Sequence, residues 1–179
     1  MPEPADDARE TVTLQIMEKA FAVNAYGPVL LTQALLPNIL AAPAPRRLGV
    51  ISSRVGSITD NTSGGYYAYR ASKTAVNSFF KSFAVELKEH DVIVFMLHPG
   101  FTNTNLNAEI KNYPGVVEPD VAARGLWKTV SSKGLEDTGK FWVRKASCAA
   151  SINRIHIGAA NMGICYVASR GQRAALVGT

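Results

Sequence analysis

Residues 64–80, GGYYAYRASKTAVNSFF, carry the pattern on which the fold prediction depends. Two glycines end a polar loop, and a helix is expected to begin at about Tyr67 and to continue to Glu89. Apolar residues at helical spacing predict its buried face, which consists of Val76, Phe79, Phe80, Phe83, Ala84 and Leu87. The stretch therefore predicts a helix that packs on a core directly after a polar loop.

Two apolar runs on either side of this helix predict buried strands. LGVIS, residues 48–52, contains β-branched residues and precedes the polar loop at residues 56–65. VIVFML, residues 92–97, is a continuous apolar run, which is typical of a parallel strand covered by helices on both faces. Both strands are therefore expected in one parallel sheet.

Three further elements complete the alternation of helices and strands. An apolar helix is expected over about residues 15–40, loosened in its middle by Gly27-Pro28. Another helix is expected over about residues 120–132, and GKFWV, residues 139–143, predicts a last strand. This order predicts an α/β fold with a doubly wound parallel sheet.

Only one of the three tyrosines in the opening stretch has a lysine four residues later. Residues i and i+4 share a helix face, so Tyr69 and Lys73 are expected side by side. A fixed ammonium favours the phenolate and lowers the pKa of a phenol, which is otherwise a poor base at neutral pH. Arg70 has the same place after Tyr66, but a guanidinium is bulkier and is not a compact point charge.

Polar residues elsewhere fall where such a tyrosine needs partners. Ser53 follows the strand at residues 48–52, and the carboxyl ends of parallel strands form the edge where these sheets bind ligands. HPGFTNT, residues 98–104, ends the next strand at the same edge. Asn24 lies inside a helix, where asparagine is a mediocre helix former. Taken singly, Asn24 is explained by a helix kink, Ser53 by a turn, and Thr102 and Thr104 by loop capping. Their combination with Tyr69 favours a functional site.

With these stretches in this order, the sequence resembles the short-chain dehydrogenase/reductase family, and in particular its C-factor-like members. The resemblance covers roughly residues 14–143 and rests on VNAYG, ISS, Tyr-x-x-x-Lys and a Pro-Gly followed by threonines. It implies a partial, Rossmann-like domain over residues 14–143, between an N-terminal lead at residues 1–13 and a divergent basic tail at residues 144–179.

The resemblance also implies a catalytic set of Asn24, Ser53, Tyr69 and Lys73. Tyr69 would be the general acid/base, and Lys73 would lower its pKa and hold the nicotinamide ribose. Ser53 would orient the substrate, and Asn24 would hold a water of the proton relay. The implied cofactor, NADP or NAD, would be contacted by Asn24, Tyr69, Lys73, Pro99, Gly100, Thr102 and Thr104. The implied reaction is hydride transfer between this cofactor and a small-molecule carbonyl or alcohol.

The sequence departs from the family pattern at its start. Neither the Thr-Gly-x-x-x-Gly-x-Gly turn that binds the pyrophosphate nor the Asn-Asn-Ala-Gly stretch occurs here. We therefore expect only the C-terminal half of the sheet, about three strands with flanking helices, with exposed apolar surface and an unpaired strand edge. Two functions stay open: an oxidoreductase, inactive if truncation prevents cofactor binding, and a non-catalytic remnant that acts as a binding or C-factor-like signalling module.

Charge and composition argue against other classes of protein. The net charge of +5 comes from residues 143–179, which hold five basic and no acidic residues, whereas residues 1–142 hold 14 of each. Such thinly spread charge predicts a solvated tail and makes a nucleic-acid binder a distant alternative.

Neither a signal peptide nor a long apolar run is evident, so a cytoplasmic protein without membrane contact is expected. Cys148 and Cys165 lack metal-site spacing and are expected to be buried or idle thiols, and no metal is expected. The folded chain is predicted to be a homo-oligomer.

Overall fold

The structure, a computed structural model, describes residues 4–106 and 112–144 of the chain. The predicted basic tail, apart from Arg144, and both cysteines lie outside these residues. The main elements in chain order are α1 (Leu14–Phe21), the π-helix η1 (Ala22–Tyr26), α2 (Gly27–Ala41), β1 (Arg46–Ile51), α3 (Tyr67–Glu86), β2 (Val92–His98), α4 (Pro119–Ser131) and β3 (Lys140–Val143). Short 3-10 turns lie at η2 (Arg54–Gly56), η3 (Lys88–His90) and η5 (Leu135–Asp137).

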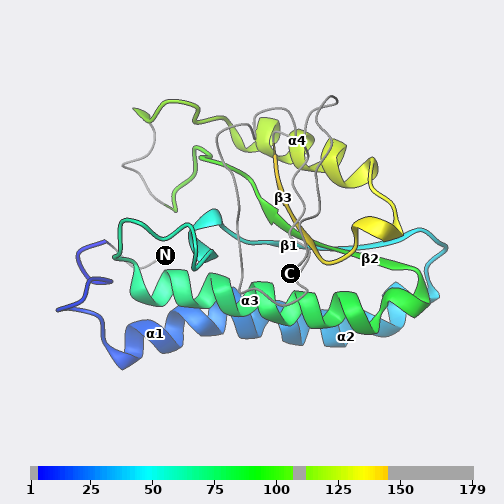
Figure 1. Ribbon diagram of the computed structural model, residues 1–179, viewed down its shortest axis with the longest axis horizontal. Coiled ribbons are helices and arrows are strands. Elements are labelled where there is room, and N and C mark those ends of the chain that lie inside the picture. Colours follow the sequence, from blue (N-terminus) through cyan, green and yellow to red (C-terminus); the bar gives the residue numbers. More distant parts are fainter. Residues whose placement is uncertain (1–3, 107–111, 145–179) are drawn as a thin grey trace, which may run out of the picture.

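The three strands form one parallel sheet in the order β1-β2-β3. Helices α1, α2 and α3 lie on one side of this sheet and α4 on the other (Figure 1). Ile51 pairs with Leu97, and Leu97 pairs with Trp142, so the three strands end at one edge. The prediction of an α/β fold with a parallel sheet between helices is confirmed.

Strand β2 is the centre of the core because both of its faces are buried. Its residues alternate between two clusters, as the period of two along a strand requires. Val92, Val94 and Met96 pack with Val76 and Phe80 of α3. On the opposite face the cluster consists of Ile93, Phe95, Leu97, Leu126, Val130, and Trp142. The continuous apolar run in the sequence thus corresponds to a strand covered on both sides.

Helix α3 turns a slightly different face to the sheet than the sequence predicts. Val76, Phe80 and Ala84 are buried, as expected, and they recur every four residues toward the sheet. The prediction for Phe79 is wrong, because its side chain is 39% exposed. Phe79 precedes Phe80 by one position, or about 100° of helix rotation. Its side chain therefore lies beside the row of Val76, Phe80 and Ala84 that faces the sheet. Phe83 is partly buried and packs edge-on against Phe80.

The irregularity in the first long helix lies at Asn24, just before the predicted Gly27-Pro28. The N–H of Gly27 donates to the Ala22 carbonyl, five residues earlier, as in a π-helix. Pro28 has no N–H to offer the carbonyl of Asn24, so the regular ladder cannot close at this point. The π-helical turn is therefore centred on Asn24, the asparagine that the sequence singles out inside this helix.

Within the described residues, β1 pairs only with β2 and forms an edge of the sheet. Ile51 on this strand is 52% exposed, and Leu30, Leu31 and Leu35 of α2 are also exposed. The expected apolar surface and unpaired edge are present in this part of the chain. Among residues 4–106 and 112–144, no helix combines the length and apolarity that crossing a bilayer requires.

We expect Phe80→Ala to lower the free energy of unfolding by about 3–5 kcal/mol, because it opens a cavity in the cluster between α3 and the sheet. Phe79→Ala is the matched control, and its exposed ring should cost less than about 1 kcal/mol. Urea unfolding of the three proteins measures both changes. Equal losses of unfolding free energy in the two variants would contradict the finding that Phe80 is buried and Phe79 is exposed.

Candidate active site

The candidate site lies where β1 and β2 end and α3 begins its first turns. The Ser52 N–H donates to the Leu97 carbonyl at 2.7 Å, so the pairing of the two strands continues past Ile51. Ser53 and Pro99 therefore follow side by side at the carboxyl edge of the sheet, which is the ligand-binding edge of such folds.

At this edge the structure brings Ser53, Tyr69 and Lys73 together. The Ser53 side chain lies close enough to the Tyr69 phenol to lower its pKa through hydrogen bonding. The Nζ of Lys73 lies 5.8 Å from the centroid of the Tyr69 ring and donates to the Ile51 carbonyl at 3.1 Å. Tyr67 is 45% exposed and belongs to no such cluster. Tyr69 thus lies beside both a serine and a lysine.

Burial determines the electrostatics of this pair. Burial raises the pKa of Tyr69, and the hydrogen bond with Ser53 lowers it by a smaller amount. Burial also lowers the pKa of Lys73, which is only 8% exposed. Burial is the largest effect on the phenol, and the expected lowering of the Tyr69 pKa by Lys73 is not among its causes. At neutral pH the phenol is a protonated acid.

Asn24 reaches this cluster through the backbone of Tyr69. Its Nδ2 donates to the Ser72 hydroxyl at 3.1 Å, and that hydroxyl donates to the Tyr69 carbonyl at 2.9 Å. Ser52 makes a parallel connection farther along α3, where its hydroxyl donates to Asn77 Oδ1 at 2.7 Å. The π-helix and the end of β1 are thus both tied to α3 by polar side chains.

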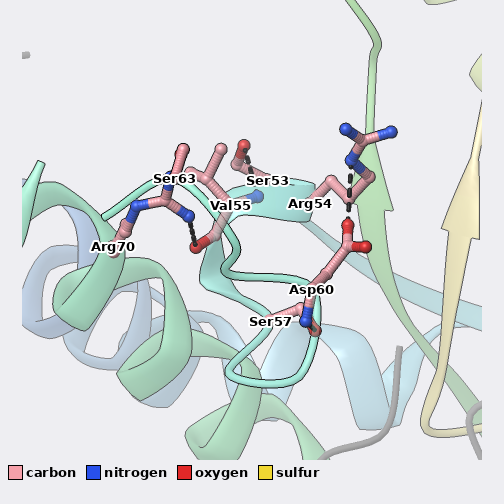
Figure 2. A network of polar contacts seen from close by, with 7 residues as sticks. All are labelled: Ser53, Arg54, Val55, Ser57, Asp60, Ser63 and Arg70. Atoms are coloured by element: carbon pink, nitrogen blue, oxygen red, sulfur yellow. Dashed lines mark hydrogen bonds and ion pairs between the residues drawn. The ribbon is translucent and has the colours of Figure 1, made fainter. Parts of the chain in front are cut away.

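The loop between β1 and α3 is fastened to the helix by Arg70, the residue after Tyr69. Its guanidinium donates to the carbonyls of Val55, Gly64 and Gly65 and to the Ser63 hydroxyl, at 2.9 to 3.3 Å. Figure 2 shows Arg70 directed at Val55 and Ser63, which come from the two ends of the loop. The Arg70 side chain therefore holds the loop that follows Ser53.

The start of this loop also lies directly on the backbone of Lys73. A Cβ on Gly56 would come within 2.8 Å of the Lys73 carbonyl carbon, so only glycine permits this approach. Thr74 Oγ1 donates to the Gly56 carbonyl at 2.7 Å, and Arg54 forms an ion pair with Asp60 at 3.1 Å (Figure 2). The loop is thereby held in one place relative to Lys73.

The predicted cofactor contacts after β2 lie at the same edge, within a loop of their own. The Pro99 carbonyl accepts from Arg144 Nε at 2.8 Å, and Gly100 has a φ of +77°, which favours glycine. Thr102 forms a parallel bridge with Val117. The Thr104 hydroxyl accepts from the Leu106 N–H at 3.3 Å.

A residue that the sequence did not single out holds the backbone of Tyr69. The carboxylate of Asp7 accepts from the N–H groups of Ala68, at 2.7 Å, and Tyr69, at 3.0 Å. Asp7 stands in the predicted N-terminal lead, 61 residues before Ala68, and no local motif links the two. Ser72 was not predicted from the sequence as part of the site either, although its place between Tyr69 and Lys73 indicated it.

His98 closes β2 at the edge of the site. Its Nδ1 is buried and has no hydrogen-bond partner among the residues that the structure describes. Burial, together with the nearby charges of Arg54 and Arg144, lowers the pKa of His98 from 6.5 to about 4. The imidazole is therefore neutral at physiological pH.

Comparison with known proteins adds the following similarities in sequence. The family model described as short chain dehydrogenase matches residues 4–114. The chain is 36% identical over 126 residues to the C-signal of Myxococcus xanthus, covering 70% of this chain and 73% of that protein. It is 36% identical, over 126 residues, to the 1-hydroxy-2-glutathionyl-2-methyl-3-butene dehydrogenase of Rhodococcus sp. (strain AD45), covering 70% of this chain and 54% of that protein.

Solved structures are similar to this chain in fold. The NADPH-bound carbonyl reductase from chicken fatty liver superimposes with a TM-score of 0.68 and 26% identity, over 80% of this chain and 60% of that one. The carbonyl reductase Sniffer of D. melanogaster has a TM-score of 0.68 and 27% identity, over 76% of this chain and 57% of that one. The chain thus spans between about half and three quarters of the length of these proteins.

The depressed pKa of His98 predicts a specific loss of stability in acid. Between pH 6.5 and about 4 the unfolded chain binds a proton that the folded chain does not, so stability falls as the pH falls. Relative to the parent, His98→Gln should remove about 3 kcal/mol of this loss.

Urea unfolding at a series of pH values measures the effect, with His90→Gln as the control because the His90 side chain is 51% exposed. A parent and a His98→Gln variant with the same pH dependence would contradict the described burial of His98.

Proposed function

Because this chain belongs to the short-chain dehydrogenase family, we propose that it is an NAD(P)-dependent oxidoreductase that reduces a small-molecule carbonyl group. The observation that carries the proposal is the cluster of Ser53, Tyr69 and Lys73 at the carboxyl edge of the parallel sheet. The similarity to an NADPH-bound carbonyl reductase and to a dehydrogenase supports it. A protonated phenol can supply the acid that reduction needs at the substrate oxygen.

The residues present fit the nicotinamide ribose end of the cofactor. Lys73 is a buried ammonium with three N–H donors, of which one contacts Ile51, and the others suit ribose hydroxyls. Gly100, at a positive φ beside Pro99, offers backbone without a side chain. Thr102 and Thr104 complete the proposed contacts from the same edge. When bound, the cofactor supplies the hydride.

The protein itself supplies the proton and positions the substrate oxygen that receives it. The Tyr69 phenol donates its proton to the substrate oxygen, while the Ser53 hydroxyl donates a hydrogen bond to the same oxygen as negative charge develops there. The phenolate that remains is stabilised by the Lys73 ammonium near its ring. Asn24 holds the water that returns a proton to this pair, with a carbonyl that Pro28 leaves without its regular helical donor.

A second candidate is a binding or signalling module that needs no cofactor. The similarity to a protein named C-signal favours it. The two candidates are separated by titrating the full chain with NADPH and NADH and recording fluorescence enhancement and thermal shift. Binding supports the oxidoreductase, and absence of binding leaves the signalling module. The cytoplasmic location and the homo-oligomeric state stay predictions.

Tyr69→Phe should lower kcat for carbonyl reduction by about 10²–10⁴-fold, because it removes the proton donor and keeps the ring. The dissociation constant for NADPH should change by less than about twofold, since the ring and Lys73 remain in place. Turnover is measured as NADPH oxidation with a panel of aromatic aldehydes and α-diketones. Tyr67→Phe, at an exposed tyrosine two residues earlier, is the control and should keep parental turnover. Near-parental turnover in Tyr69→Phe would refute the assigned role.

A further inference from the structure

Helix α3 begins in an unusual way, directly after three residues in the left-handed region. Gly64, Gly65 and Tyr66 have φ values of +66°, +65° and 52°, and Tyr66, which occupies the N-cap, makes no side-chain capping bond. A non-glycine residue with positive φ is uncommon, and the first N–H groups of any helix lack partners within it. The first turn of α3 therefore needs acceptors from elsewhere in the chain.

Asp7 supplies these acceptors. Its backbone carbonyl accepts from the Tyr67 N–H at 3.3 Å, and its two carboxylate oxygens accept from Ala68 at 2.7 Å and Tyr69 at 3.0 Å. The Asp7 side chain is fully buried. A carboxylate at a helix N-terminus is favoured by the helix dipole, and bonds to a charged acceptor are stronger than neutral ones. Three consecutive N–H groups of α3 thus depend on one residue.

The segment that carries Asp7 has its own internal bonds. Thr11 Oγ1 donates to the Ala5 carbonyl at 2.6 Å and accepts from the Ala8 N–H at 3.2 Å, and the Val12 N–H donates to the Ala8 carbonyl at 2.9 Å. The turn directs Asp7 inward, whereas its neighbour Asp6 is exposed. The predicted lead is therefore part of the structure that supports the site.

We propose that Asp7 is a positioning residue for Tyr69, an inference that rests on the proposed oxidoreductase function. The Tyr69 backbone is held on both sides, by Asp7 at its N–H and by Ser72 at its carbonyl. These two bonds fix where the phenol meets Ser53. A misplacement of about 1 Å is enough to lower turnover strongly, so the catalytic geometry depends on a residue outside the catalytic set.

The kinetic test compares Asp7→Ala and Asp7→Asn with the matched control Asp6→Asn. Asp7→Ala should lower kcat for NADPH-dependent carbonyl reduction by about tenfold or more, while KM for NADPH changes by less than about twofold. Asp7→Asn keeps one carbonyl acceptor and should fall between Asp7→Ala and the parent. Asp6→Asn should match the parent. A parental kcat in both Asp7 variants overturns the proposal.

A second readout does not depend on turnover. Amide hydrogen exchange, followed by NMR, should be faster at Ala68 and Tyr69 in Asp7→Ala than in the parent, and unchanged in Asp6→Asn. The Tyr69 phenol, followed by NMR of its labelled ring, should ionise at lower pH in Asp7→Ala because it loses burial. Parental exchange together with parental ionisation overturns the proposal.

The two readouts also separate failure of this proposal from failure of the proposed function. A parent that neither binds NADPH nor turns over refutes the oxidoreductase, while exchange and ionisation still decide whether Asp7 positions Tyr69. If Asp7→Ala does not fold, Asp7→Asn decides by the same measurements, since it keeps the size of the side chain.

Discussion

The position of helix α3 against the end of β1 is the constraint on which the rest of the structure depends. Lys73 contacts the Ile51 carbonyl, and Ser52 contacts Asn77, so buried polar groups of the strand end and the helix satisfy each other. Because a buried polar group without a partner is costly, these bonds permit one register of the helix on the strand. The close approach of Gly56 to Lys73 fixes the same register through packing. The candidate site is a consequence of this register.

Burial and a hydrogen-bonding neighbour act in opposite directions on the pKa of Tyr69. The Ser53 side chain lowers this pKa, but taking the phenol out of water favours the neutral form. Burial is the larger effect, so the resting phenol keeps its proton. Under the proposed function, such a group donates its proton to the substrate oxygen, and the Lys73 charge matters only after the proton has left. The same burial lowers the pKa of Lys73. The pKa shifts of Tyr69 and Lys73 thus have the same main cause.

Local patterns in the sequence were sufficient for the elements and for the Tyr69 and Lys73 pair. The apolar run of β2 and the i, i+4 spacing act over a few residues, and the structure has both features. The exposure of Phe79 was not predictable in this way, because one residue of helix rotation separates it from the core. The acceptor at the start of α3 was not predictable either, since Asp7 reaches it across 61 residues through a fold that no local motif encodes.

We propose that the edge formed by Ser53, Tyr69 and Lys73 holds a nicotinamide cofactor beside a proton donor. A crystal structure of the full chain grown with NADP or NAD tests it most directly. We predict that the nicotinamide ribose lies on Tyr69 and Lys73, with the nicotinamide next to Pro99 and Gly100 at the carboxyl edge of β1 and β2. A nucleotide bound elsewhere, or a Tyr69 side chain turned away from Ser53, would contradict it.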